Sequence, residues 1–137
     1  MNNRIVIASV LKPTDDVRGY WKIGQSLVKT NKYEVNIIGN RGKIEINEDN
    51  IQVHPHDIHR SQWLKRLALR YVILLKLVRM KPKVFIFCTH ELLFVASLTK
   101  LLCNSKLVYD VQENYLLNAS MNGFIGKLFG RLIRLKE

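Results

Sequence analysis

Short apolar runs alternate with amphipathic segments along the chain, and this spacing predicts the order of its elements. Residues 4–10 form a β-branched apolar run typical of a buried strand, and residues 17–30 carry apolar side chains at helical spacing. Residues 33–38 and 51–53 predict two more strands, with a polar loop or weak hairpin between them. The strand at 51–53 is expected to stop at His54-Pro55-His56-Asp57, because proline disrupts strand pairing.

The second half of the chain continues the alternation. A helix is expected from residue 60 or 61 to about residue 80, then a strand over 83–87 that is apolar on both faces, as inside a parallel sheet. A helix over 92–102, a strand over 106–110 and a last helix over 123–135 follow. Alternating strands and helices predict an α/β fold: a Rossmann-like parallel sheet with helices on both faces.

Composition places the chain among globular proteins. Its 137 residues suit a single domain, 1–137, and 47% of them are hydrophobic. Met1-Asn2-Asn3-Arg4 leads directly into a strand rather than a signal peptide, and no apolar run reaches the roughly 18 residues of a membrane span. We therefore expect a cytoplasmic protein whose two cysteines are free thiols.

The charge is unevenly distributed. Lys and Arg number 22 against 11 Asp and Glu, and eight of the basic residues lie between Arg60 and Lys83, where no acid occurs. Apolar side chains stand between the charges there and again in residues 126–137, and basic amphipathic segments of this kind bind anionic interfaces. The residues concerned are Lys65, Arg66, Arg70, Lys76 and Arg79 in the first segment and Lys127, Arg131 and Arg134 in the second.

These segments predict an anionic membrane surface as a partner, with peripheral contact on the inner face of the cytoplasmic membrane. Two other interpretations stay open. The first segment is also a core helix with Lys and Arg extending to water, and its exposed apolar surface suits a protein partner. The charge alone permits nucleic acid, but aromatic and basic residues do not interleave as in a stacking platform, which argues against it.

Polar side chains gather after three of the predicted strands. Because ligands of open α/β sheets bind at the carboxyl ends of the strands, these clusters predict one wall of a binding cleft. The alternative is that each cluster only caps the helix that follows. The polar residues are Thr14, Asp15, Asp16 and Arg18 after the first strand, Thr89, His90 and Glu91 after the fourth, and Asp110, Gln112, Glu113 and Asn114 after the fifth.

Several familiar sites are absent from the sequence. It contains no G-x-G-x-x-G, no P-loop and no G-x-S-x-G elbow. His54, His56, Asp57 and His59 crowd together, but their spacing matches no metal motif and Pro55 indicates a solvated loop, so no metal is predicted. Cys88 lies in an apolar run and is expected to be a small buried hydrophobe.

Three stretches resemble the N-terminal, acceptor-side domain of GT-B-fold, family-4-like glycosyltransferases, and together they span nearly the whole chain. The first strand-helix-strand unit of that domain, with its D-x-R segment, is resembled by KPTDDVRGYWKIGQSLVKTNKYEVNIIG. PKVFIFCTHELLFVASLTKLL resembles the segment where a strand ends in a His-acid pair, and SKLVYDVQENY resembles V-Y-D-x-H-E. The last two stretches, in this order, are the more specific.

The resemblance implies one half of a GT-B fold that holds a sugar or lipid-linked acceptor, while a donor-binding domain or subunit holds the nucleotide sugar. It implies no cofactor in this chain. The implied acceptor-side residues are Asp16, Arg18, His90, Glu91, Asp110, Gln112 and Glu113. No catalytic residue is assigned, because Gln112 stands where the family has histidine and glutamine cannot titrate near neutral pH.

We expect this chain to be without a donor-binding domain, and transfer requires donor and acceptor to be held together. We therefore expect an acceptor-binding half of a retaining, nucleotide-sugar-dependent glycosyltransferase of surface polysaccharide or glycolipid synthesis, inactive alone. The alternative is a non-catalytic binding or scaffold protein, or a truncated remnant of such an enzyme. A nucleic-acid-binding module is the third possibility.

Overall fold

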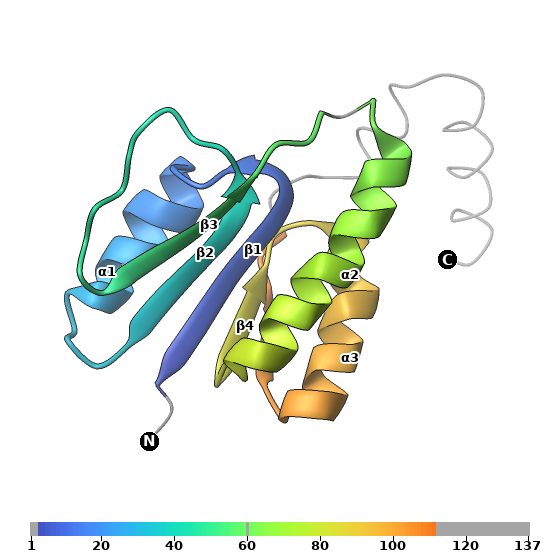
Figure 1. Cartoon of the computed structure of the whole chain (residues 1–137). Helices are drawn as coiled ribbons and strands as arrows, with labels where there is room; N and C mark the ends of the chain where they lie inside the picture. The colour runs from blue at the N-terminus through green and yellow to red at the C-terminus, as the bar shows by residue number, and fades with distance from the viewer. Residues whose placement is uncertain (1–2, 60, 112–137) are drawn as a thin grey trace, which may run out of the picture.

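A five-stranded parallel sheet forms the centre of the computed structural model, which describes residues 3–59 and 61–111 (Figure 1). The strand order is β3-β2-β1-β4-β5, and every pairing is parallel. This confirms the predicted Rossmann-like α/β sheet. The strands are β1 (Arg4–Pro13), β2 (Glu34–Asn40), β3 (Ile51–His56), β4 (Val84–Phe87) and β5 (Lys106–Tyr109).

Helices cover both faces of the sheet, as predicted. A π-helical segment η1 (Val17–Gly24) continues into α1 (Gln25–Val28) on one face. The other face carries α2 (Trp63–Met80) and α3 (Leu93–Cys103), which lie side by side (Figure 1). A short 3-10 turn, η2 (His90–Leu92), precedes α3. No helix within 3–59 or 61–111 has the length and hydropathy to cross a membrane.

The alternation of side chains along the central strand β1 builds two core layers. Val6, Ala8 and Val10 pack beneath α2 and α3. Ile5 and Ile7 point to the opposite face, where Tyr20 of η1 covers them. Because both faces of β1 are buried, its sequence is a continuous apolar run rather than an alternating one.

The predicted end of the third strand was wrong. β3 continues to His56, with Pro55 opposite Gly39 of β2, instead of breaking at His54-Pro55. Among the described strands β3 is the last in the sheet, so one side of its backbone has no strand neighbour. Proline lacks only an N–H donor and is tolerated in such an edge strand.

Candidate functional site

The chain crosses from β1 to η1 at the carboxyl edge of the sheet, and Asp16 fixes this crossing. Asp16 Oδ2 accepts hydrogen bonds from the backbone N–H groups of Arg18 (3.1 Å) and Gly19 (3.0 Å). Asp16 is therefore the N-cap of η1, as its position before the helix predicts. The neighbouring Asp15 holds the next loop instead, accepting from the backbone N–H groups of Lys43 (2.8 Å) and Ile44 (3.1 Å).

An ion pair joins two of the predicted clusters across the sheet edge. Arg18 Nη2 lies 2.6 Å from Asp110 Oδ1. The Asp110 side chain is 9% exposed and that of Arg18 is 55% exposed, so the carboxylate anchors a guanidinium that largely faces solvent. The backbone N–H of Asp110 donates to Phe87 O, which places this carboxylate beside the end of β4.

In the polar cluster after β4, one side chain faces solvent and another faces the protein interior. His90 is exposed at the start of η2, whereas the Glu91 side chain is only 5% exposed. Glu91 forms ion pairs with Arg66 and Arg70 of α2, and its Oε2 lies 3.4 Å from Arg70 Nη2. The carboxylate of Glu91 thus attaches the carboxyl end of β4 to α2.

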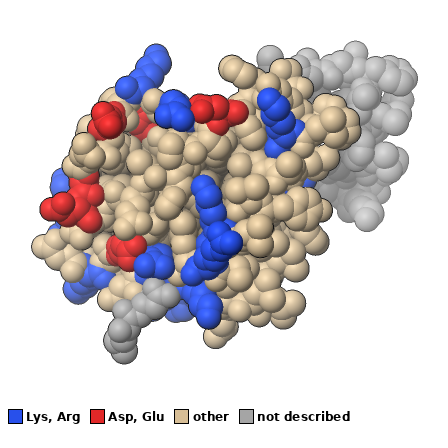
Figure 2. Space-filling model, in the orientation of Figure 1, with Lys and Arg blue, Asp and Glu red and all other residues tan. Residues whose placement is uncertain are grey.

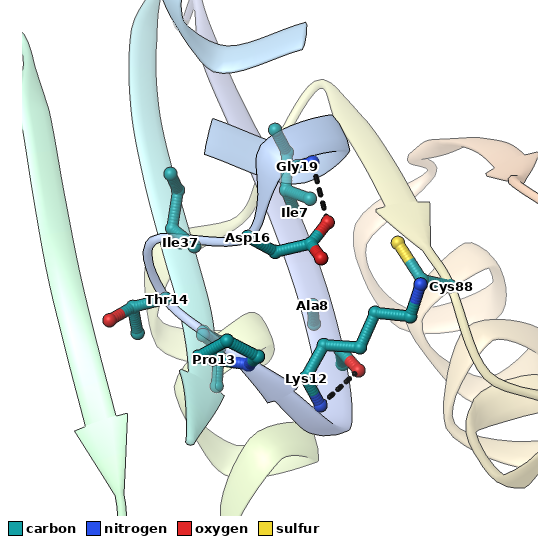
Figure 3. Close-up of a pocket in the computed structure, with 11 residues that line it drawn as sticks. Ile7, Ala8, Lys12, Pro13, Thr14, Asp16, Gly19, Ile37 and Cys88 are labelled. Atoms are coloured by element: carbon teal, nitrogen blue, oxygen red, sulfur yellow. Dashed lines mark hydrogen bonds between the residues drawn. The ribbon is translucent and has the colours of Figure 1, made fainter. Parts of the chain in front are cut away.

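A small cavity lies beneath the β1–η1 crossing (Figure 3). Its volume is about 10 Å³, which is room for one water molecule. Lys12, Asp16, Gly19 and Cys88 contribute to its wall, and the Lys12 side chain extends toward Cys88 (Figure 3). This cavity is therefore too small for any ligand larger than water.

Cys88 is buried at the carboxyl end of β4. Burial raises the pKa of its thiol to about 11, and the nearby carboxylate of Asp110 adds to this shift. The thiol is therefore protonated at neutral pH and is a poor nucleophile. Lys12 and Asp16 line the same cavity as Cys88, and Arg18 is paired with Asp110, so charged groups lie around the end of β4.

A groove of about 490 Å³ lies on the other side of the β1–η1 crossing, between residues 41–47 and β3. Arg41 stands at this groove and forms a two-pronged pair with Asp57, with Nη2 to Oδ2 at 3.1 Å. Both side chains are 67% exposed. Thr14, one of the polar residues predicted to line a cleft, contributes to the wall of this groove, but none of the acceptor-side residues implied by the resemblance does.

No protein-family model, curated protein or solved structure matches the chain. The fold and the chemistry of the sheet edge therefore carry the functional argument.

The structure brings four of the predicted acceptor-side residues to one edge of the sheet: Asp16, Arg18, His90 and Asp110. Glu91 belongs to the same edge but turns toward α2. Gln112 and Glu113 lie outside the described residues, and so do Lys127, Arg131, Arg134 and the helix predicted over 123–135.

The basic residues predicted on α2 have different surroundings. Lys65 and Arg79 are exposed. Arg66 and Arg70 are paired with Glu91, and Lys76 is half-buried near His54 and His56.

Asn40 is a structural residue of this edge that sequence reasoning missed. Its Nδ2 donates to Leu11 O (3.2 Å) and Ile58 O (2.8 Å), and its Oδ1 accepts from the backbone N–H of Ile58 (3.0 Å). One side chain thus holds the ends of β1 and β3 together. The available signal was an asparagine directly after an apolar strand, a residue type that readily bonds to nearby backbone.

The histidines of β3 are hydrogen-bonded within the fold. His54 Nε2 lies 2.9 Å from Asn36 Oδ1, and His56 Nε2 lies 2.9 Å from the carbonyl oxygen of Val10. Because a carbonyl only accepts, Nε2 of His56 carries the hydrogen. Across residues 3–59 and 61–111, no three His, Cys, Asp or Glu side chains group as metal ligands would.

These histidines predict a loss of stability in mild acid. Burial, aided by the charge of Lys76, lowers the pKa of both His54 and His56 below the ordinary value of 6.5. As the pH falls below about 6.5, these histidines take up protons more readily in the unfolded chain than in the folded one. The stability that the two neutral histidines contribute is therefore present at higher pH and is lost as the pH falls from about 6.5 through their lowered pKa values. Protonated His56 would also bury a second N–H, because its Nδ1 has no hydrogen-bond partner.

We expect the free energy of unfolding in urea to fall between about pH 7 and pH 5. The double variant His54→Gln/His56→Gln should show a smaller fall, whereas the exposed His59→Gln should behave like the wild type. Equal pH dependence in the wild type and the double variant would contradict this assignment.

Proposed function

We propose that this chain is the acceptor-binding half of a retaining, nucleotide-sugar-dependent glycosyltransferase of surface polysaccharide or glycolipid synthesis. The observation that carries the proposal is the Arg18–Asp110 pair at the carboxyl edge of the sheet, beside exposed His90. These residues come from three separate segments that the sequence resemblance assigns to the acceptor side. In open parallel sheets, this edge is where ligands bind.

Arg18 suits recognition of a phosphate or carboxylate on the acceptor. A guanidinium carries five N–H donors in a planar fork, and the ion pair with Asp110 engages Nη2. The remaining fork is available on a side chain that is 55% exposed. Asp110 restrains the arginine, so less side-chain freedom is lost when an anionic ligand binds.

The proposed donor half is another domain or subunit that carries the nucleotide sugar. In this arrangement Arg18 and His90 orient the acceptor, and the partner brings the reacting sugar to it. We expect the 137-residue chain alone to transfer no sugar. The proposed location is the cytoplasm, at the inner face of the membrane, where a lipid-linked acceptor would be presented.

Binding of a hexose 1-phosphate, used as a probe of a phosphorylated sugar acceptor, tests the proposal. We expect Arg18→Gln to weaken its affinity about tenfold or more, because a charge-assisted contact is lost. Arg41→Gln is the matched control, since Arg41 is also paired with an aspartate but lies at the other groove. Isothermal titration calorimetry on the full chain and the two variants measures the difference.

Equal affinities in the two arginine variants would overturn the assignment of Arg18. A further comparison uses the unphosphorylated hexose, which should bind more weakly than the phosphorylated probe to the wild type and equally to both variants. If single-stranded nucleic acid binds the wild type more tightly than either sugar at moderate salt, the glycosyltransferase proposal fails.

A further inference from the structure

The outward surfaces of α2 and α3 are apolar. On α2, Leu64, Tyr71 and Leu75 share one side of the helix and are 64%, 66% and 59% exposed. On α3, Phe94 and Leu101 are 64% and 79% exposed. We call these five residues the outer apolar strip. Helices that cover a sheet normally turn polar side chains outward, so this strip indicates a contact with something apolar.

The strip is not part of the core of this domain. The opposite side of α2 carries Leu69, Ile73 and Leu77, which are buried against the sheet. α2 thus has one apolar side that packs in the core and a second apolar side that is exposed.

Within the described residues, the exposed charged groups on α2 and α3 are basic. From Ser61 to Lys106 the sequence has nine Lys and Arg and a single acid, Glu91, which is buried against Arg66 and Arg70. Lys65, Arg79 and Lys100 are exposed on the two helices that bear the strip. In Figure 2 the red acidic side chains lie mainly over the part of the molecule that holds β2 and β3, and the surface over α2 and α3 is tan and blue.

These features favour one kind of partner. A second copy of this chain would bring the same basic charges to the contact, and like charges repel. A membrane with anionic phospholipids offers hydrocarbon for the strip and negative headgroups for the lysines and arginines. Tyr71, and Trp63 at the start of α2, combine an apolar body with a polar end, which suits the boundary between the two.

We propose that the outer apolar strip docks on an anionic phospholipid surface, with Lys65, Arg79 and Lys100 on the headgroups. Docking on the faces of α2 and α3 leaves η1 on the far side of the sheet, away from the lipid. Arg66 and Arg70 serve Glu91 and are not the lipid contacts. This surface is distinct from the Arg18–Asp110 edge, so the proposal stands whether or not the chain binds a glycosyl acceptor.

The two tryptophans of the chain test this orientation directly. Trp63 begins α2 and is 62% exposed, whereas Trp21 belongs to η1 on the opposite face and is 50% exposed. In the full-length chain, Trp21→Phe leaves Trp63 as the fluorophore and Trp63→Phe leaves Trp21. Each variant is mixed with phosphatidylglycerol–phosphatidylcholine vesicles whose acyl chains carry bromine, which quenches tryptophan in contact with lipid. We expect quenching and a blue shift of Trp63 emission, with Trp21 emission unchanged.

A charge placed in the strip should reduce binding in vesicle sedimentation. Leu75→Glu and Leu101→Glu are each expected to lower the partition coefficient roughly tenfold. The matched control is Ile44→Glu, an equal change of charge at a residue that is 52% exposed in the loop before β3. Pure phosphatidylcholine vesicles should bind the wild type much more weakly than the anionic ones.

Three results would overturn the proposal. Sedimentation with vesicles while Trp63 emission stays unchanged would mean that another segment makes the contact. Equal losses for Leu75→Glu and Ile44→Glu would show an effect of net charge rather than of the strip. If the protein remains in the supernatant with anionic vesicles at low salt, the strip does not bind lipid, and a protein partner becomes the better interpretation.

Discussion

Replacing Glu91 by alanine should lower the free energy of unfolding by about 3 kcal/mol, because two arginines would lose the buried charge that they share. The Arg66 and Arg70 side chains are only 21% and 32% exposed, so water cannot fully replace the carboxylate. Glu91 also connects the carboxyl end of β4 to α2, and its loss removes that connection. Urea denaturation of the full chain at neutral pH, followed by circular dichroism, measures the effect.

The matched control for Glu91 is Asp57→Ala, which removes the acid of the Arg41–Asp57 pair. Both of these side chains are 67% exposed, so water replaces the lost partner and the urea midpoint should hardly change. If the two alanine variants lose equal stability, the Glu91 cluster is no stronger than an ordinary surface pair. Recovery of stability in Glu91→Asp would show that the charge matters more than the side-chain length.

The sheet and the meeting of Arg18 with Asp110 followed from local rules. β-branched runs mark the strands, and the alternation with helices makes them parallel. Parallel strands end at a common edge, so polar residues after β1 and β5 are brought close although more than 90 residues separate Arg18 from Asp110 in the sequence. The sheet topology, rather than the identity of any one residue, explains why the predicted common edge matches the observed Arg18–Asp110 pair.

The direction of Glu91 could not be predicted in the same way. Its partner Arg66 is 25 positions away on a helix, and their contact depends on how α2 packs against the start of α3. Sequence spacing gives the element on which a residue stands but not which neighbour its side chain reaches. For the same reason the basic residues of α2 were grouped together, although the fold divides them between the Glu91 cluster and the outer surface.

Pro55 and Asn40 show a second limit of sequence reasoning. Whether proline ends a strand depends on the position of that strand in the sheet, and the order of the strands is a property of the whole fold. The bonds of Asn40 to Leu11 and Ile58 likewise need three segments to be in place. Gly39, the residue before Asn40, is subject to an equally nonlocal constraint.

Gly39→Ala should lower the free energy of unfolding by about 2 kcal/mol and weaken binding at the Arg18–Asp110 edge. A Cβ at this position would lie 2.8 Å from the carbonyl oxygen of Lys12 and 3.3 Å from the backbone nitrogen of Thr14. These are backbone atoms, so the β1–η1 crossing itself must move, and it carries Arg18. We expect a lower urea midpoint together with weaker affinity for the hexose 1-phosphate probe.

Gly19→Ala is the matched control for Gly39, because it adds the same methyl group to the other end of this crossing. A Cβ at Gly19 would meet Asp16 Oδ2 at 3.7 Å and Ile7 Cγ2 at 3.8 Å, which are ordinary contacts. Since glycine is unfavourable inside a helix, this change should leave stability equal or raise it by about 0.5–1 kcal/mol. Gly39→Ala with wild-type stability would show that the crossing yields easily, and the site would then not depend on close packing of β1 against β2.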